Sequence, residues 1–293
     1  MKQLSHRQPT RLRNRRCAYC NAEFTRSDEP QKEHVIGRLF VPRGSLEQQW
    51  NLHINSCHAC NQRKSTLEND ISAISIFATE VDSISYDESL VAEKHRKSKA
   101  FSNRTRKLVA ESGEIFEVHG NVGSAQISFT MRGPPQLDDE RAFKLALFQL
   151  QAFHFFLTYD QSQEQGFHWR GVYSPLDFVN DSDWGNPLIV AFSDLTLAWD
   201  LRLDVNTSKG HYRALVKKNP SAAVWSWAME WNKYFRIFGF YGDEVAIEAI
   251  FADLSGPVKI MEEAWIEMSP TRRYRMEVPV DAEADKFFDV ARV

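Results

Sequence analysis

All four cysteines of the chain lie in two Cys-x-x-Cys pairs, Cys17 with Cys20 and Cys57 with Cys60. Four thiolates at this spacing are typical of a closed tetrahedral zinc site, in which the metal stabilises the fold. In a reducing compartment such cysteines are expected to bind zinc rather than to form disulfides. The spacing therefore predicts a structural zinc ion held by Cys17, Cys20, Cys57 and Cys60.

A histidine and harder ligands lie beside and between these pairs, and their chemistry suits phosphodiester hydrolysis. His34, with an ordinary pKa near about 6.5, can take a proton from water and is the predicted general base. The carboxylate of Glu33 and the amide oxygen of Asn61 are ligands that Mg²⁺ or Mn²⁺ prefers. Neighbouring side chains of a strand point to opposite faces, so Glu33 and His34 can share a site only if the backbone bends between them. Asn61 is alternatively the N-cap of the helix that follows.

Three segments in this order resemble the zinc-bracketed HNH endonucleases, the ββα-metal family, over residues of about 17–80: Cys-Ala-Tyr-Cys, then Glu-His-Val-Ile-Gly-Arg, then Trp-Asn-Leu-His-Ile-Asn-Ser-Cys-His-Ala-Cys-Asn-Gln-Arg-Lys. The resemblance implies a DNA endonuclease that nicks or cuts with a single catalytic Mg²⁺ or Mn²⁺, bound by Glu33 and Asn61. It implies that His34 activates water and that Asn51 steadies the loop carrying His34. The expected nucleic-acid contacts are Arg38, Arg63 and Lys64.

Three positions depart from the family pattern. The residue before the histidine is usually aspartate, and Glu33 is one methylene group longer. Gly37 stands where a proline often follows the histidine, which predicts a looser loop. Asn51 lies further from the second cysteine pair than is usual, so Asn55 is a second candidate for the middle asparagine, with Asn51 favoured. The neighbouring histidines left open as ligands or phosphate contacts are His53 and His58.

Charge is distributed unevenly along the chain. Residues 1–107 carry 19 lysines and arginines against 12 acids, whereas residues 108–293 carry 17 against 27. Basic clusters on both sides of a candidate phosphate site favour DNA as the partner, although a solvated arm and helix face would have the same composition. No run approaches the about 18 apolar residues of a membrane span, and the N-terminus lacks the apolar core of a signal peptide. We therefore expect a cytoplasmic protein that binds DNA and no membrane.

The apolar periodicity distinguishes helical from extended segments. The predicted elements are strands near 33–36 and 50–52, a helix from 61 to about 80, a polar helical connector from 81 to about 107, a helix at 141–157, a Gly/Asp/Asn-rich stretch at 160–186, and strands at 195–205, 225–231 and 235–238. The last two are expected to form a hairpin in an antiparallel sheet. The tryptophans that alternate between Trp225 and Trp231 are predicted core rather than a base-stacking platform.

These elements predict an α+β chain of distinct parts. The expected parts are a basic N-terminal arm (1–16), an HNH nuclease domain (17–80), a basic helical connector (81–112) and an acidic α+β domain of unknown role (113–293). The last part is expected to bind a protein partner or a ligand, or to restrain the nuclease. A non-catalytic zinc-dependent DNA-binding or assembly protein is the alternative function, and RNA is a less favoured substrate. Mobile-element, phage-related and defence roles all fit.

Overall fold

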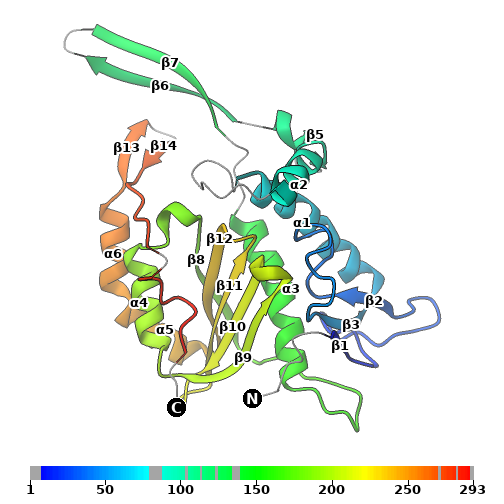
Figure 1. The fold of residues 1–293 in the computed structure, drawn as a ribbon. Helices are drawn as coiled ribbons and strands as arrows, with labels where there is room; N and C mark the ends of the chain where they lie inside the picture. The colour runs from blue at the N-terminus through cyan, green and yellow to red at the C-terminus, as the bar shows by residue number, and fades with distance from the viewer. Residues whose placement is uncertain are drawn as a thin grey trace.

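The computed structural model confirms the α+β class (Figure 1). It describes residues 8–78, 88–102, 105–112, 114–122, 125–133, 139–269, 272–281 and 283–290. Among these residues, no helix is both long and apolar enough to cross a lipid bilayer.

The N-terminal part is a small sheet followed by a long helix. Strand β2 (Gln31–His34) runs antiparallel to β3 (Leu52–Ser56), and β1 (Thr10–Arg11) adds to β3 in parallel. Helix α1 (His58–Ala78) follows directly. The expected order of strand, loop, strand and helix is confirmed, although β2 ends earlier and β3 begins later than predicted. Residues 79–80, the predicted end of the helix, lie outside the described residues.

The boundaries of β2 and β3 differ from the prediction because the side chain of Asn51 replaces a strand partner. After Val35, whose amide still bonds to Leu52, the backbone of Ile36 pairs with the side chain of Asn51 instead of a strand. Part of the predicted basic arm, whose residues 1–7 lie outside the described residues, belongs to the sheet. Thr10 and Leu12 donate backbone hydrogen bonds to β3 and the residue before it, so this stretch is a strand of the sheet rather than a free arm.

The second half contains a five-stranded antiparallel sheet in the order β8-β12-β11-β10-β9. Its strands are β8 (Val172–Val179), β9 (Asp200–Thr207), β10 (Tyr212–Lys218), β11 (Val224–Trp231) and β12 (Phe235–Gly242). The predicted hairpin is confirmed, with Trp231 opposite Phe235. Trp227 and Trp231 are fully buried, so their prediction as core residues is also confirmed.

One prediction for this half was wrong, and one strand was not predicted. The segment 195–205 is not one strand, because helix α4 (Pro187–Thr196) extends into it and β9 begins only at Asp200. Asn186 caps the N-terminus of α4 by accepting a hydrogen bond from the Ile189 amide. The apolar alternation after residue 195 obscured this helix in the sequence. The Gly/Asp/Asn-rich stretch 160–186, for which no strand was predicted, contains β8. As an edge strand β8 tolerates Pro175, which weakened its strand pattern.

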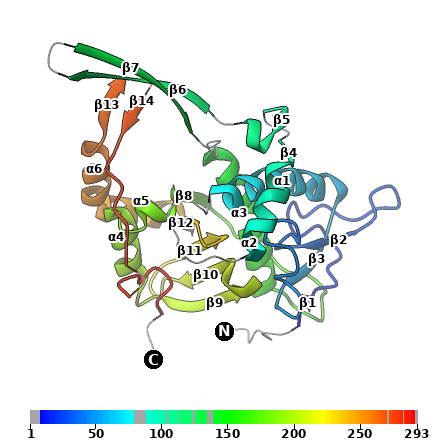
Figure 2. The same ribbon diagram turned by 45° about the horizontal axis from the view of Figure 1, so that its top comes forward.

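Helix α3 (Asp139–Leu157), close to its predicted range, lies between the large sheet and the N-terminal part (Figures 1 and 2). One continuous hydrophobic cluster runs from Leu52 and Ile71 through Phe153 to Trp231. The opposite face of the sheet is covered by α4, α5 (Glu244–Asp253) and α6 (Ser255–Glu263). The hydrophobic core is therefore continuous between the N-terminal part and the face of the large sheet that α3 covers.

The connector contains α2 (Glu88–Ser98), in line with its predicted helical character. The short elements β4 (Phe101–Ser102), β5 (Lys107–Leu108) and η1 (Val109–Glu111) follow. A hairpin of β6 (Glu114–Val122) and β7 (Ala125–Gly133) then extends away from the body, a feature that we did not predict (Figures 1 and 2). The remaining elements are η2 (Asp181–Asp183), η3 (Ser208–Gly210), β13 (Ile266–Ser269) and β14 (Arg272–Tyr274).

Candidate functional site

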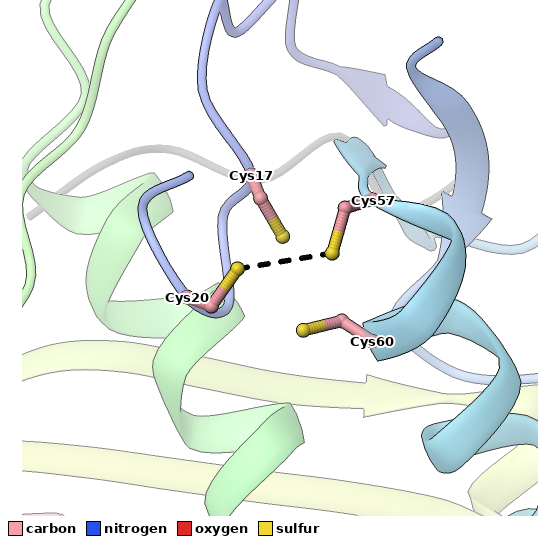
Figure 3. A group of neighbouring side chains, drawn as sticks. All are labelled: Cys17, Cys20, Cys57 and Cys60. Atoms are coloured by element: carbon pink, nitrogen blue, oxygen red, sulfur yellow. Dashed lines mark hydrogen bonds between the residues drawn. The ribbon is translucent and has the colours of Figure 1, made fainter. Parts of the chain in front are cut away.

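The four cysteines converge on one point (Figure 3). Their sulfur atoms all lie within 4.8 Å of one another, and Sγ of Cys20 is 3.7 Å from Sγ of Cys57. In a tetrahedral site with zinc–sulfur bonds of about 2.3 Å, the sulfurs are about 3.8 Å apart. The cluster is therefore of the right size and chemistry to hold a metal ion such as zinc, as its spacing predicted.

The cysteine cluster joins three parts of the fold. Cys17 and Cys20 lie in a tight turn closed by the hydrogen bond from the Cys17 amide to the carbonyl of Ala22. The other pair comes from the start of α1 (Figure 3). Tyr19, between the first two cysteines, packs edge-on against Phe148 of α3 with ring centroids 5.0 Å apart. A metal here would fix the N-terminal sheet and α1 against α3.

A second group of side chains forms a row across the small sheet. In the strand register Arg11 of β1 is opposite His53 of β3, and His53 is opposite His34 of β2. Residues opposite one another in neighbouring strands share a face, so the three lie side by side. The imidazole rings of His34 and His53 are 4.2 Å apart between centroids. The sheet register thus brings His34 together with His53, which the sequence left open as a ligand or phosphate contact, and with Arg11, which was not expected in the site.

Two adjoining hollows open over this row. One, of about 360 Å³, is lined by Arg11, His34 and His53 together with Lys32 and others. The second, of similar size, shares these three residues and adds Arg38. The row is therefore accessible from solvent, and basic side chains outnumber acidic ones in the lining of the two hollows.

Both histidines of the row have a lowered pKa in the free protein. Burial lowers the pKa of His34 to about 4, helped by the nearby His53 and by the positive charge of Arg38. Burial also lowers the pKa of His53, with further contributions from Arg11 and Arg38. Both imidazoles are consequently neutral at pH 7 and available to accept a proton.

The histidine pKa predicts how stability depends on pH. An unfolded histidine has a pKa of about 6.5, whereas His34 in the fold has one of about 4. Between these values the unfolded chain binds more protons, so the free energy of unfolding should fall as pH drops from about 6.5 to 4. Urea unfolding at pH 7.5 and 5 measures the loss, which should be smaller in a His34→Asn variant. An equal loss in that variant would show that His34 does not contribute.

The loop after His34 is held by Asn51. Its Oδ1 accepts a hydrogen bond from the Ile36 amide at 3.2 Å, and its Nδ2 donates to the Ile36 carbonyl at 2.8 Å. The other candidate, Asn55, pairs instead with Asn14 through its amide and side chain. Asn51 is therefore the asparagine that fixes this loop.

The loop is not loosened at Gly37, contrary to our expectation. The Gly37 amide donates to Glu68 Oε1 at 3.0 Å. A Cβ at this position would collide with the same carboxylate, whose Cδ would be only 2.7 Å away. A larger residue here would have to displace the Glu68 carboxylate, which the Gly37 amide and Lys64 hold in place.

The structure does not assemble the predicted divalent-cation site. Glu33 is only 7% exposed, and its side chain points toward α1, away from the face that carries His34. Lys64 Nζ of α1 binds Glu33 Oε1 at 2.7 Å. The backbone does not bend between Glu33 and His34, because both belong to β2. Asn61 donates its side-chain amide to Gln31 at 2.9 Å and lies inside the first turn of α1, so it is not the N-cap either. Glu33 and Asn61 therefore do not fit a catalytic Mg²⁺ or Mn²⁺ beside His34.

The three predicted nucleic-acid contacts lie in different environments. Arg38 is exposed and lines the hollow over the histidines. Arg63 is exposed on α1, where its Nε donates to the Ala59 carbonyl. Lys64 is fully buried, so its prediction as a phosphate contact was wrong. His58, left open earlier, bonds with Gln31 outside the row.

Lys64 instead forms buried ion pairs and a backbone hydrogen bond behind the row. Its Nζ binds Glu33, Glu68 at 2.6 Å and the carbonyl of His34 at 3.1 Å. Burial lowers its pKa, but Glu68 and Glu33 raise it by more, so that the pKa ends above its ordinary value. Lys64 is thus a buried ammonium that ties α1 to the backbone of the candidate general base.

Comparison with protein-family models, with curated proteins and with solved structures found no match to this chain.

Proposed function

We propose that this protein is a DNA endonuclease whose active site is the row of Arg11, His53 and His34. The observation that carries the proposal is a neutral, accessible His34 among unpaired positive charges, on a strand-loop-strand-helix unit braced by four cysteines. The resemblance of residues 17–80 to the HNH endonucleases supports the same function. A basic surface with a proton acceptor at its centre suits attack on a phosphodiester.

In this proposal His34 removes a proton from water while the water oxygen bonds to phosphorus. The bond from phosphorus to the leaving sugar oxygen breaks, and that oxygen takes a proton from solvent. The low pKa of His34 keeps the imidazole unprotonated, and the arginines stabilise the charge that develops on the phosphate. Asn51 and Lys64 act on the backbone beside His34 and are positioning residues.

The test is His34→Ala assayed on supercoiled plasmid. Removing a general base typically lowers the rate by about 10²–10⁴-fold, so cleavage should be nearly lost while metal content and thermal unfolding stay close to wild type. His58→Ala is the matched control, because that exposed histidine lies outside the row. Cleavage by His34→Ala at the wild-type rate would contradict the proposal.

A non-catalytic DNA-binding or assembly protein is the second candidate, favoured by one observation. The residues expected to bind a catalytic cation are engaged with Lys64 and Gln31. Plasmid incubated with Mg²⁺, Mn²⁺ or neither separates the two functions, since the second predicts salt-dependent binding of duplex DNA with no cleavage in any condition. Duplex RNA offered in parallel tests the choice of substrate.

A further inference from the structure

Arg11 and Arg38 are the two arginines that line the second hollow together with His34 and His53. Several other arginines are paired with a carboxylate, for example Arg15 with Glu164 and Arg141 with Asp70. Within the described part of the chain, no ion pair is formed by either Arg11 or Arg38. An exposed pair of uncompensated guanidinium groups beside two neutral histidines is an environment suited to an anion.

The position of Arg11 is fixed by the sheet and not by its own side chain. The backbone on either side of it bonds to β3, from the Thr10 amide to the Asn51 carbonyl and from the Leu12 amide to the His53 carbonyl, each at 2.9 Å. Trp50 Nε1 also donates to the hydroxyl of Thr10. Arg11 is therefore held next to His53 while its guanidinium remains free to bind a ligand.

The hollows continue on both sides of the row. Toward α3, a third hollow shares Arg11 and Arg13 with the first. In the other direction, a fourth shares Arg38 with the second and adds Arg43. Positive side chains therefore follow one another along a surface that crosses the histidines. A chain of phosphates has the repeating charge that such a surface can bind.

We infer that Arg11 and His53 bind the phosphate group on which His34 acts, so that the N-terminal strand β1 is part of the active site. The guanidinium of Arg11 donates to the non-bridging oxygens in the fork geometry that suits phosphate. His53, between Arg11 and His34, donates a ring N–H to the same group. Arg38 lines the second hollow with these three residues. The ligand class is a phosphodiester of a nucleic-acid backbone, which rests on the proposed function; the phosphate site itself does not.

Inorganic phosphate is the probe, and the imidazole NMR signals of His34 and His53 are the readout. In the wild-type chain, phosphate should shift both signals and raise both pKa values, because an adjacent anion favours imidazolium. Arg11→Ala should weaken phosphate binding by about 10- to 100-fold, the usual effect of losing a charge-assisted contact. Arg11→Lys should recover part of it, since it keeps the charge and loses the fork. Arg15→Ala removes the same charge four residues away, outside the row, and should bind phosphate as wild type does.

Two outcomes would overturn the inference. One is a wild-type chain whose His34 and His53 signals do not respond to phosphate, and the other is wild-type affinity in both Arg11 variants. Plasmid cleavage by the same proteins then distinguishes this inference from the proposed function. If Arg11→Ala weakens phosphate binding but the wild-type protein does not cut DNA, the phosphate site is supported and the nuclease function is refuted. Cleavage that is unaffected by Arg11→Ala supports the nuclease and refutes the role of Arg11.

Discussion

Removing the metal from the four cysteines is expected to lower the unfolding temperature by at least about 10 °C. Zinc binds to zinc-finger peptides with a free energy of about 10–16 kcal/mol. Where the unfolded chain has no preformed site, this binding free energy stabilises the folded state. Here the sulfurs are contributed by a turn and by the start of α1, and Cys17, Cys57 and Cys60 belong to the core that continues into α3. Loss of the metal should therefore destabilise the shared core and not only the N-terminal sheet.

The measurement is differential scanning calorimetry of the purified protein before and after chelation, with metal content determined in parallel. We expect one zinc ion per chain, and the same decrease in Cys60→Ser without chelator. Adding zinc back to the wild type should restore the original temperature, whereas Cys60→Ser should not respond. An unchanged unfolding temperature after complete removal of the metal would mean that the cluster does not stabilise the fold.

The parts of the fold that the sequence predicted well are those with a strong repeating pattern. Trp225, Trp227 and Trp231 follow a period of two in β11, and the last two are fully buried. The period of α1 was equally clear after the second cysteine pair. β8 was missed because an edge strand with a proline and half-buried residues has little pattern of its own. Local periodicity therefore identified central elements better than edge elements.

The candidate site was predicted only in part, for a different reason. The alternation rule already showed that Glu33 and His34 would point apart unless the backbone bent, and the structure keeps them apart. No local pattern, however, shows that Lys64 reaches Glu33 across 31 residues. Arg11 could not be predicted as a site residue, because β1 is only two residues long and has no recognisable periodicity. Its place beside His53 depends on strand register, a property of the whole sheet.

Replacing Lys64 by methionine is expected to destabilise the protein by about 3–5 kcal/mol. Lys64 is fully buried between Glu33 and Glu68, and without its ammonium these carboxylates would face each other in the interior uncompensated. Urea unfolding measures the loss, and Lys99→Met, at an exposed lysine, is the matched control. The proposed cleavage should fall as well, because the bond from Lys64 to the His34 carbonyl is lost.

The pH dependence of this loss separates charge from packing. Burial already raises the pKa of Glu68, and Lys64 opposes the rise, so removing Lys64 should raise this pKa further. An acid whose pKa is higher in the fold than in the unfolded chain destabilises the fold at pH values above its unfolded pKa. The cost of Lys64→Met should therefore be largest near pH 8 and should shrink toward pH 5. Adding Glu33→Gln and Glu68→Gln should restore much of the stability at pH 8, since neutral amides can keep the hydrogen bond to the Gly37 amide. If the cost is the same at both pH values and the amides restore nothing, Lys64 contributes through packing rather than through its charge.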